Sequence, residues 1–170
     1  MAKKEKSKQI FASTVERLGR KTVFSASLGK IGGTAGFTVR AANNTDLATC
    51  AASQTAAKFV LPLNGLKVGD KITAFHLIGQ IESAGGAVTV DVDLRKMTAA
   101  AADPVDASIS TMTQLSVTAD TAMDSSNTSK TLATPEVIAA DSSYYLLITA
   151  TTAGSTDIAL QAGAITVTEQ

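Results

Sequence analysis

Two aspartates, Asp91 and Asp93, lie two positions apart in a segment that alternates between apolar and polar residues. Residues i and i+2 of an extended strand project from the same face, so these carboxylates could form an acid–base pair or hold a hard cation. Paired acids on a solvated strand are much commoner, and Arg95 follows on the same face to balance part of the charge. Because the sequence fixes no third carboxylate nearby, we expect no catalytic or metal-binding role.

The chain has a single histidine, His76, and a single cysteine, Cys50. A catalytic triad needs a histidine beside an acid and a nucleophile, and no motif such as Gly-x-Ser-x-Gly places these groups together. Cys50 lies among small residues, with no basic neighbour to lower the pKa of its thiol. We therefore expect His76 at a surface or subunit interface, Cys50 as structural filler, and no enzymatic activity.

Three glycines near Lys30 loosely resemble a phosphate-binding loop, but neither Gly-x-x-x-x-Gly-Lys-Ser/Thr nor Gly-x-Gly-x-x-Gly is present. The sequence thus predicts no cofactor and no small-molecule substrate. A single cysteine excludes an intrachain disulfide and fits synthesis in a reducing cytosol. No apolar run of signal-peptide length follows the basic start, and the apolar run at 144–148 is far shorter than the roughly 20 residues that span a bilayer. We expect a soluble protein with no membrane partner.

The first thirty residues carry eight basic residues against two acidic ones, a net charge of +6, and the remainder carries −6. We interpret residues 1–45 as an extended basic arm with weak hydrophobic periodicity, interrupted by one short helix over residues 13–19. Residues 46–170 form the second predicted unit, a β-sandwich domain. The candidate partner-binding residues are the basic ones of the arm: Lys3, Lys4, Lys6, Lys8, Arg17, Arg20, Lys21 and Lys30.

Such an arm could bind an acidic protein surface or a nucleic-acid backbone. Phe11 is the one aromatic residue before position 20, which leaves little to stack on bases. An acidic protein surface is therefore the favoured target, and nucleic acid is the less favoured alternative.

Period-two alternation begins near Phe59. Residues 87–95 place four apolar side chains on one face and polar ones on the other, which predicts a half-buried strand. Residues 71–82 place Phe75, Leu77 and Ile81 on one face, and the Ser-Ala-Gly-Gly stretch at 83–86 predicts an antiparallel hairpin between these two segments. Further strands are predicted at 59–63, 108–115, 134–138, 143–151 and 157–168.

No segment shows a helix of ordinary length, so we predict an all-β fold, an antiparallel β-sandwich in its jelly-roll version, with an extended N-terminal arm. The polar stretch 118–130 is long for a hairpin connection and is the candidate exposed functional loop. Aromatic residues make up only 4% of the chain, so the core must consist of small aliphatic side chains. Subunit association is a common way to bury more apolar area, and we expect an oligomer.

Five segments follow one another in this order: FVLPL (59–63), GDKITAF (69–75), VTVDVDLRK (88–96), SSYYLLI (142–148) and AITV (164–167). Together they resemble a family of small β-sandwich modules of tailed-bacteriophage virions and prophage-derived proteins. The resemblance covers roughly residues 57–168. It implies a virion structural protein, with head decoration (cement) as the leading form.

In that role the protein would be assembled in the host cytoplasm and located on the capsid surface. Its partners would be the major capsid protein lattice, along which the arm would lie, and two further copies of itself in a homotrimer. The alternative is a receptor- or carbohydrate-binding module of a phage fibre or tail. Such modules usually offer aromatic platforms to sugar rings, and here Tyr144, Tyr145 and a few phenylalanines are the residues available.

Overall fold

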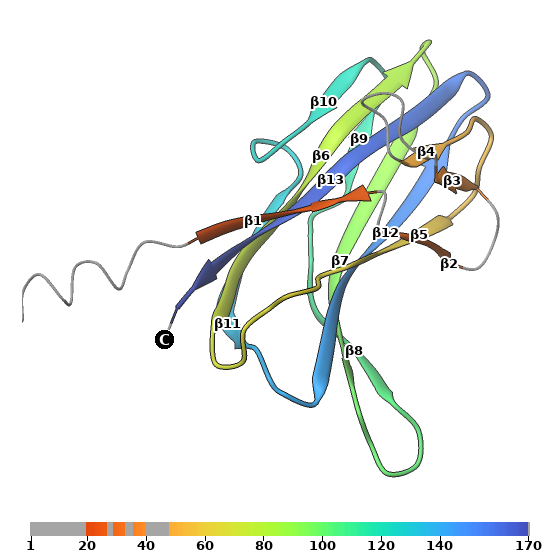
Figure 1. The fold of residues 1–170 in the computed structure, drawn as a ribbon. Helices are drawn as coiled ribbons and strands as arrows, with labels where there is room; N and C mark the ends of the chain where they lie inside the picture. Colours follow the sequence, from red (N-terminus) through yellow and green to blue (C-terminus); the bar gives the residue numbers. More distant parts are fainter. Residues whose placement is uncertain (1–19, 27–28, 33–35, 40–47, 170) are drawn as a thin grey trace, which may run out of the picture.

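The computed structural model describes residues 20–26, 29–32, 36–39 and 48–169, which form two antiparallel sheets packed face to face as a β-sandwich (Figure 1). Sheet A contains β1 (Arg20–Ser25), β3 (Phe37–Val39), β4 (Ala48–Cys50), β6 (Lys71–Ser83), β10 (Thr121–Met123), β11 (Ser129–Val137) and β13 (Thr156–Thr168). Sheet B contains β2 (Lys30–Gly32), β5 (Ala57–Pro62), β7 (Val88–Thr98), β8 (Val105–Thr111), β9 (Leu115–Val117) and β12 (Ser142–Thr152). The all-β sandwich is confirmed, and its jelly-roll version stays a prediction.

Two long strands organise sheet A. β6 pairs along the whole of one edge of β13, and the other edge of β13 pairs with β4 and then with β1. The free edge of β6 is shared in the same way by β10 and β11. In sheet B, β12 lies between β5 and β7, and β7 also pairs with β9 and β8.

The core lies between the sheets and follows the predicted alternation. Val88, Val90, Val92 and Leu94 of β7 are each 0% exposed, while the polar residues between them are half-buried on the outer face. Phe75, Leu77 and Ile81 of β6 are buried as predicted. The aliphatic core that the composition implied is joined by Phe37 and Phe59, whose ring centroids lie 5.2 Å apart.

Bulges in β6 and β13 change which alternate residues of these strands face the core. Thr73 is unpaired between the pairs Ala74–Thr166 and Ile72–Val167, so buried positions shift from Ile72 to Phe75. Gln161 has the same role in β13, where buried Leu160 is followed by buried Ile165 on the same side. A continuous twisted sheet therefore keeps one apolar face despite the interrupted period.

The predicted hairpin between β6 and β7 is wrong. The two strands belong to different sheets, and residues 84–87 cross from one sheet to the other. Gly85 takes a positive φ of 90° in this connection. Turn-forming residues predict that the chain reverses, but they do not determine whether it returns in the same sheet or in the opposite one.

Part of the predicted arm also needs correction. β1, β2 and β3 fall within residues 1–45, and they pair with β13, β5 and β4 respectively. Phe24 and Phe37 are buried in the core, so these stretches belong to the sandwich although they are too short to show periodicity. Most of the rest of the predicted arm, including the helix expected over residues 13–19, lies outside the described residues.

Candidate functional site

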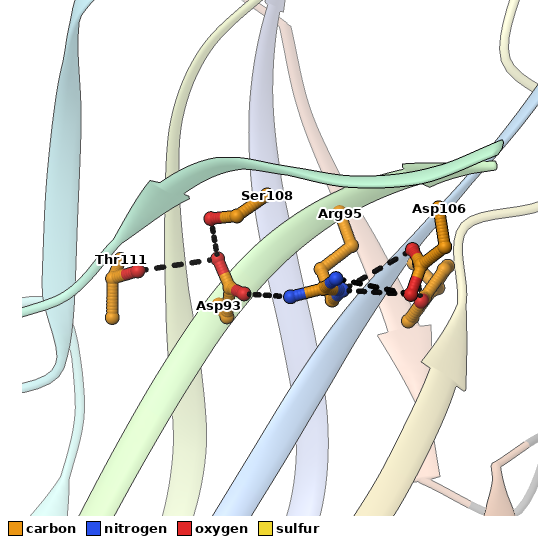
Figure 2. Close-up of polar contacts among 6 residues, drawn as sticks. Asp93, Arg95, Asp106, Ser108 and Thr111 are labelled. Carbon is orange, nitrogen blue, oxygen red and sulfur yellow. Dashed lines mark hydrogen bonds and ion pairs between the residues drawn. The ribbon is translucent and has the colours of Figure 1, made fainter. Parts of the chain in front are cut away.

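The predicted aspartate pair lies on the outer face of sheet B, and Asp93 belongs to a polar network that joins β7 to β8 (Figure 2). The Arg95 guanidinium contacts Asp93 through Nη1 at 2.6 Å and Asp106 through Nη2 at 3.0 Å. Asp93 also accepts hydrogen bonds from Ser108 Oγ at 2.5 Å and Thr111 Oγ1 at 3.2 Å. The arginine therefore holds two carboxylates that would otherwise repel each other across the hairpin.

Tyr145 of β12 extends this network by donating a hydrogen bond to Asp106 Oδ1 at 2.6 Å. Hydrogen bonds from Arg95 and then from Tyr145 hold the pKa of Asp106 below its ordinary value. Burial, followed by the hydrogen bond to Asp106, raises the pKa of Tyr145. Both groups thus keep their ordinary charge states at neutral pH, and the network ties three strands together.

Asp91 is separate from this network, because its Oδ2 accepts a hydrogen bond from Gln114 Nε2 at 2.8 Å. The two predicted aspartates share a face, as expected, but each is bonded to a different partner. Within the described residues, no group of three or more histidine, cysteine or acidic side chains is placed to hold a metal ion.

His76 is buried, at 7% exposed, and so the surface part of its prediction is wrong. It lies in β6 between Ser129 of β11 and Ala164 of β13. Burial lowers the pKa of His76, nearby Lys21 lowers it further, and Asp124 acts in the opposite direction. The imidazole is therefore favoured in its neutral form, and its place at a subunit interface stays a prediction.

Cys50 is completely buried in β4, opposite Ile158 of β13, in agreement with its prediction as structural filler. Burial, with a smaller contribution from Asp157, raises the pKa of its thiol to about 11. A thiol in this state is a poor nucleophile and a poor metal ligand at neutral pH.

The stretch 118–130 is more ordered than the predicted exposed loop. It contains β10, which pairs with β6, and a turn in which Asp124 Oδ1 accepts hydrogen bonds from Ser126 N at 2.7 Å and Ser126 Oγ at 2.6 Å. Thr128 is 0% exposed, and its hydroxyl donates to the backbone carbonyl of Leu77 at 2.9 Å. The polar composition of this stretch therefore largely serves its own folding.

Two of the candidate partner-binding residues are described with their side chains, and both are exposed at the start of β1. Arg20 lies 3.7 Å from Glu169, and Lys21 pairs through its backbone with Thr166. Lys30 is the first residue of β2. The other candidates, Lys3, Lys4, Lys6, Lys8 and Arg17, lie outside the described residues.

A groove of about 510 Å³ on the outer face of sheet B was not predicted. Its floor is formed by Val60 and Pro62 of β5 and by Leu147 and Tyr145 of β12, and Asn64, Lys58 and Asp106 contribute polar groups. The sequence feature that could have predicted this groove is the apolar run at 144–148, because apolar residues at consecutive strand positions put apolar groups on both faces of a sheet.

Within the described residues, no helix has the length and hydrophobicity needed to cross a membrane. No protein-family model matches this chain, and no curated protein is similar enough to count as a relative.

Proposed function

We propose that this chain is a structural protein of a tailed-bacteriophage virion, a decoration or cement protein that binds the outer surface of the major capsid protein lattice and stabilises the head. The observation that carries the proposal is the attachment of the basic segment, residues 1–30, to the sandwich. β1 pairs with β13 along six residues, whereas Arg20 and Lys21 at its start stay exposed. The basic residues that precede β1 in the sequence are thus connected to the sandwich through a paired strand.

Charge separation supports the same role. The first thirty residues carry +6 and the remainder −6, so one region can attract acidic surfaces that the body would repel. In the remainder of the chain, Arg95 already pairs with Asp93 and Asp106, so its charge is balanced within the protein. We propose an acidic region of the capsid lattice as the target of the basic residues, and capsid-bound homotrimers as the assembled form.

Binding to isolated heads that lack the protein tests this proposal. The double variant Lys3→Gln/Lys4→Gln removes two charges from the basic segment, and Lys58→Gln/Lys130→Gln removes two from the body as a matched control. We expect the first variant to lose roughly tenfold in affinity at low salt and to show a shallower salt dependence. The control should bind like the parent chain. Equal binding by all three proteins, unaffected by salt, would contradict the proposal.

The groove on sheet B favours a second candidate function, carbohydrate or receptor binding at a fibre or tail. It combines the Tyr145 ring and aliphatic floor with polar groups from Asn64, Lys58 and Asp106. Its volume is within the range of roughly 300–1,000 Å³ that is usual for small-molecule sites. Such a lining suits a neutral sugar, which presents C–H faces and hydroxyl groups together.

Titrating the isotope-labelled protein with a panel of neutral mono- and disaccharides would distinguish this candidate. Chemical-shift changes confined to groove residues, abolished by Tyr145→Ala and kept in Tyr144→Phe, would favour sugar binding. An absence of shifts at millimolar sugar, together with saturable binding to heads, would favour the decoration role.

A further inference from the structure

We propose that the end of the sandwich bearing the β7–β8 hairpin is the surface through which this chain associates with further copies of itself. The inference rests on the self-association part of the proposed function, and it adds the residues that make the contact. It does not depend on the identity of the particle to which the protein binds.

Exposed apolar side chains gather at this end. Five large apolar residues are exposed among the described residues: Val23 (58%), Val68 (58%), Met97 (40%), Val105 (56%) and Val137 (47%). All but Val23 lie at or beside the β7–β8 end. Single exposed apolar residues are ordinary on a protein surface, but a gathering of this kind marks an interaction site.

Backbone contacts bring these four residues together from four parts of the chain. At the base of the hairpin, Thr98 of β7 pairs both with Val105 of β8 and with Ser142 of β12. The Ala99 amide donates to the carbonyl of Asp141 at 3.0 Å, which holds the β11–β12 connection against the hairpin. Met97 therefore lies one residue from this junction.

The other two residues join from the neighbouring connection. Gly69 donates its amide hydrogen to the carbonyl of Ile138 at 2.9 Å, which places Val68 and Val137 beside the same β11–β12 connection. Figure 1 shows the β7–β8 hairpin projecting from this end, with the β11–β12 connection next to it and the β5–β6 connection beside that one.

Met97 lies opposite Asp106 on the outer face of sheet B, and Val105 lies opposite Thr98 on the other face of the hairpin. The connection that joins their two strands is also apolar. Four alanines at 99–102 and Pro104 are exposed in the hairpin connection. A shallow hollow of about 440 Å³ lies at its base, lined by Met97, Ala99, Pro104, Ala140, Asp141, Ser142 and Ser143. The hairpin thus has a projecting apolar tip and a hollow beside it. The tip of one copy could contact the hollow of a neighbouring copy.

The charges at this end of the sandwich favour a second copy of the chain as the partner that binds there. Lys67 and Asp141 are exposed at this end together with Asp103, and Lys71 is half-buried beside them, so positive and negative groups balance. Lys96 is already paired with Glu136, at 2.8 Å. A surface without net charge does not attract a strongly acidic or basic partner, whereas in an identical copy the lysines of one chain can meet the aspartates of the other.

Sedimentation equilibrium of the full chain over a range of concentrations tests the assignment. Val105→Asp places a charge in the proposed contact, Val68→Asp does the same in a connection outside the strands, and Val23→Asp is the matched control. Val23 and Val105 are both strand valines, with exposed fractions of 58% and 56%. We expect the parent chain and Val23→Asp to form the same oligomer, and the other two variants to raise its dissociation constant at least tenfold while keeping the parent circular dichroism spectrum.

The other outcomes are distinct. An oligomer that persists unchanged in both Val105→Asp and Val68→Asp would overturn this surface and leave self-association standing. Dissociation caused by Val23→Asp alone would assign the contact to sheet A instead. A parent chain that is monomeric at every concentration, both alone and on heads, would overturn self-association and this inference together, while head binding would still be judged by its own experiment.

Discussion

Cys50 gives the sharpest residue-level prediction, because its thiol is fully buried and its pKa is about 11. At pH 8 only about one thiol in a thousand is ionised even before burial blocks access. We expect no measurable reaction with a disulfide reagent in the native protein at pH 8, and complete reaction in urea above the unfolding midpoint. Rapid native labelling would mean that β4 opens locally without global unfolding.

The hydrogen bonds to Asp106 predict a specific dependence of stability on pH. Because its pKa is lowered in the folded state, the stability it contributes is present above its ordinary pKa of 3.8 and is lost as pH falls through the lower folded value. Its side chain is 41% exposed, so screening limits the loss in Asp106→Asn at pH 7 to about 0.5–1 kcal/mol of unfolding free energy.

Urea unfolding at pH 7 and pH 3 measures this effect. The difference between Asp106→Asn and the parent should shrink at pH 3, where the parent aspartate approaches protonation. Asp103→Asn, in the exposed connection of the same hairpin, is the control and should match the parent at both values. A difference that is the same at pH 7 and pH 3 would rule out the charge-based explanation.

At the scale of elements, the alternation in β7 predicts opposite outcomes for adjacent residues. Val90→Asp places a charge without a partner in the core, where Val90 is 0% exposed, and should unfold the domain at 37 °C. Thr89→Asp changes the outer face and should alter the free energy of unfolding by about 0.5 kcal/mol or less. Circular dichroism melting of both variants checks the prediction, and similar melting curves would contradict the assignment of faces.

Gly79 allows β13 to approach β6 closely beside the Gln161 bulge. A Cβ atom at this position would overlap the carbonyl oxygen of Ala159 and lie 2.9 Å from Met123 Cε. Because a backbone atom cannot move aside cheaply, Gly79→Ala should cost about 1–3 kcal/mol of unfolding free energy. Gly154→Ala meets only Ser53 Oγ, at 3.9 Å, and should be close to neutral in the same urea measurement.

Local patterns predicted the long strands well, because alternation and burial coincide in β7, β12 and β5. They did not predict which strands pair. Ser83 and Gly86 predicted a tight reversal, but only long-range packing decides that β6 joins β13 while β7 joins β12. The strands β2 and β3 have only three residues each, too few for a period, and Phe24 is the one buried residue among the six of β1. The partners of β1 and β2 lie more than twenty residues away in the sequence.

The site was predicted less completely than the fold, for a similar reason. Asp93 and Arg95 were placed together because they share one strand. Asp106 and Tyr145 come from β8 and β12, and only the register of three strands brings them to the same arginine. The burial of His76 has a related origin, since neighbours from β11 and β13 enclose a position that lies on the outer side of its own strand.

At the scale of the whole molecule, the decoration role predicts a thermal effect on particles. A protein that binds the assembled lattice in preference to dissociated subunits stabilises the assembly by mass action, by about 2.7 kcal/mol per site at a free concentration one hundred times its dissociation constant. Heads with saturating protein should therefore release their genome at a higher temperature than heads without it. Genome release is measured by dye fluorescence during parallel heating, and identical release temperatures would remove the cement role.

The position of β12 and β13 in the sandwich has a consequence for synthesis. These two strands come last among the described elements, yet each lies inside its sheet and pairs along both edges. While the ribosome is translating the earlier strands, β5, β6 and β7 lack their main partners, so the nascent chain cannot close its core in order from the N-terminus. A chain that ends before Thr156 lacks β13, the central strand of sheet A. We expect such a chain to stay unfolded and to be degraded by cellular proteases.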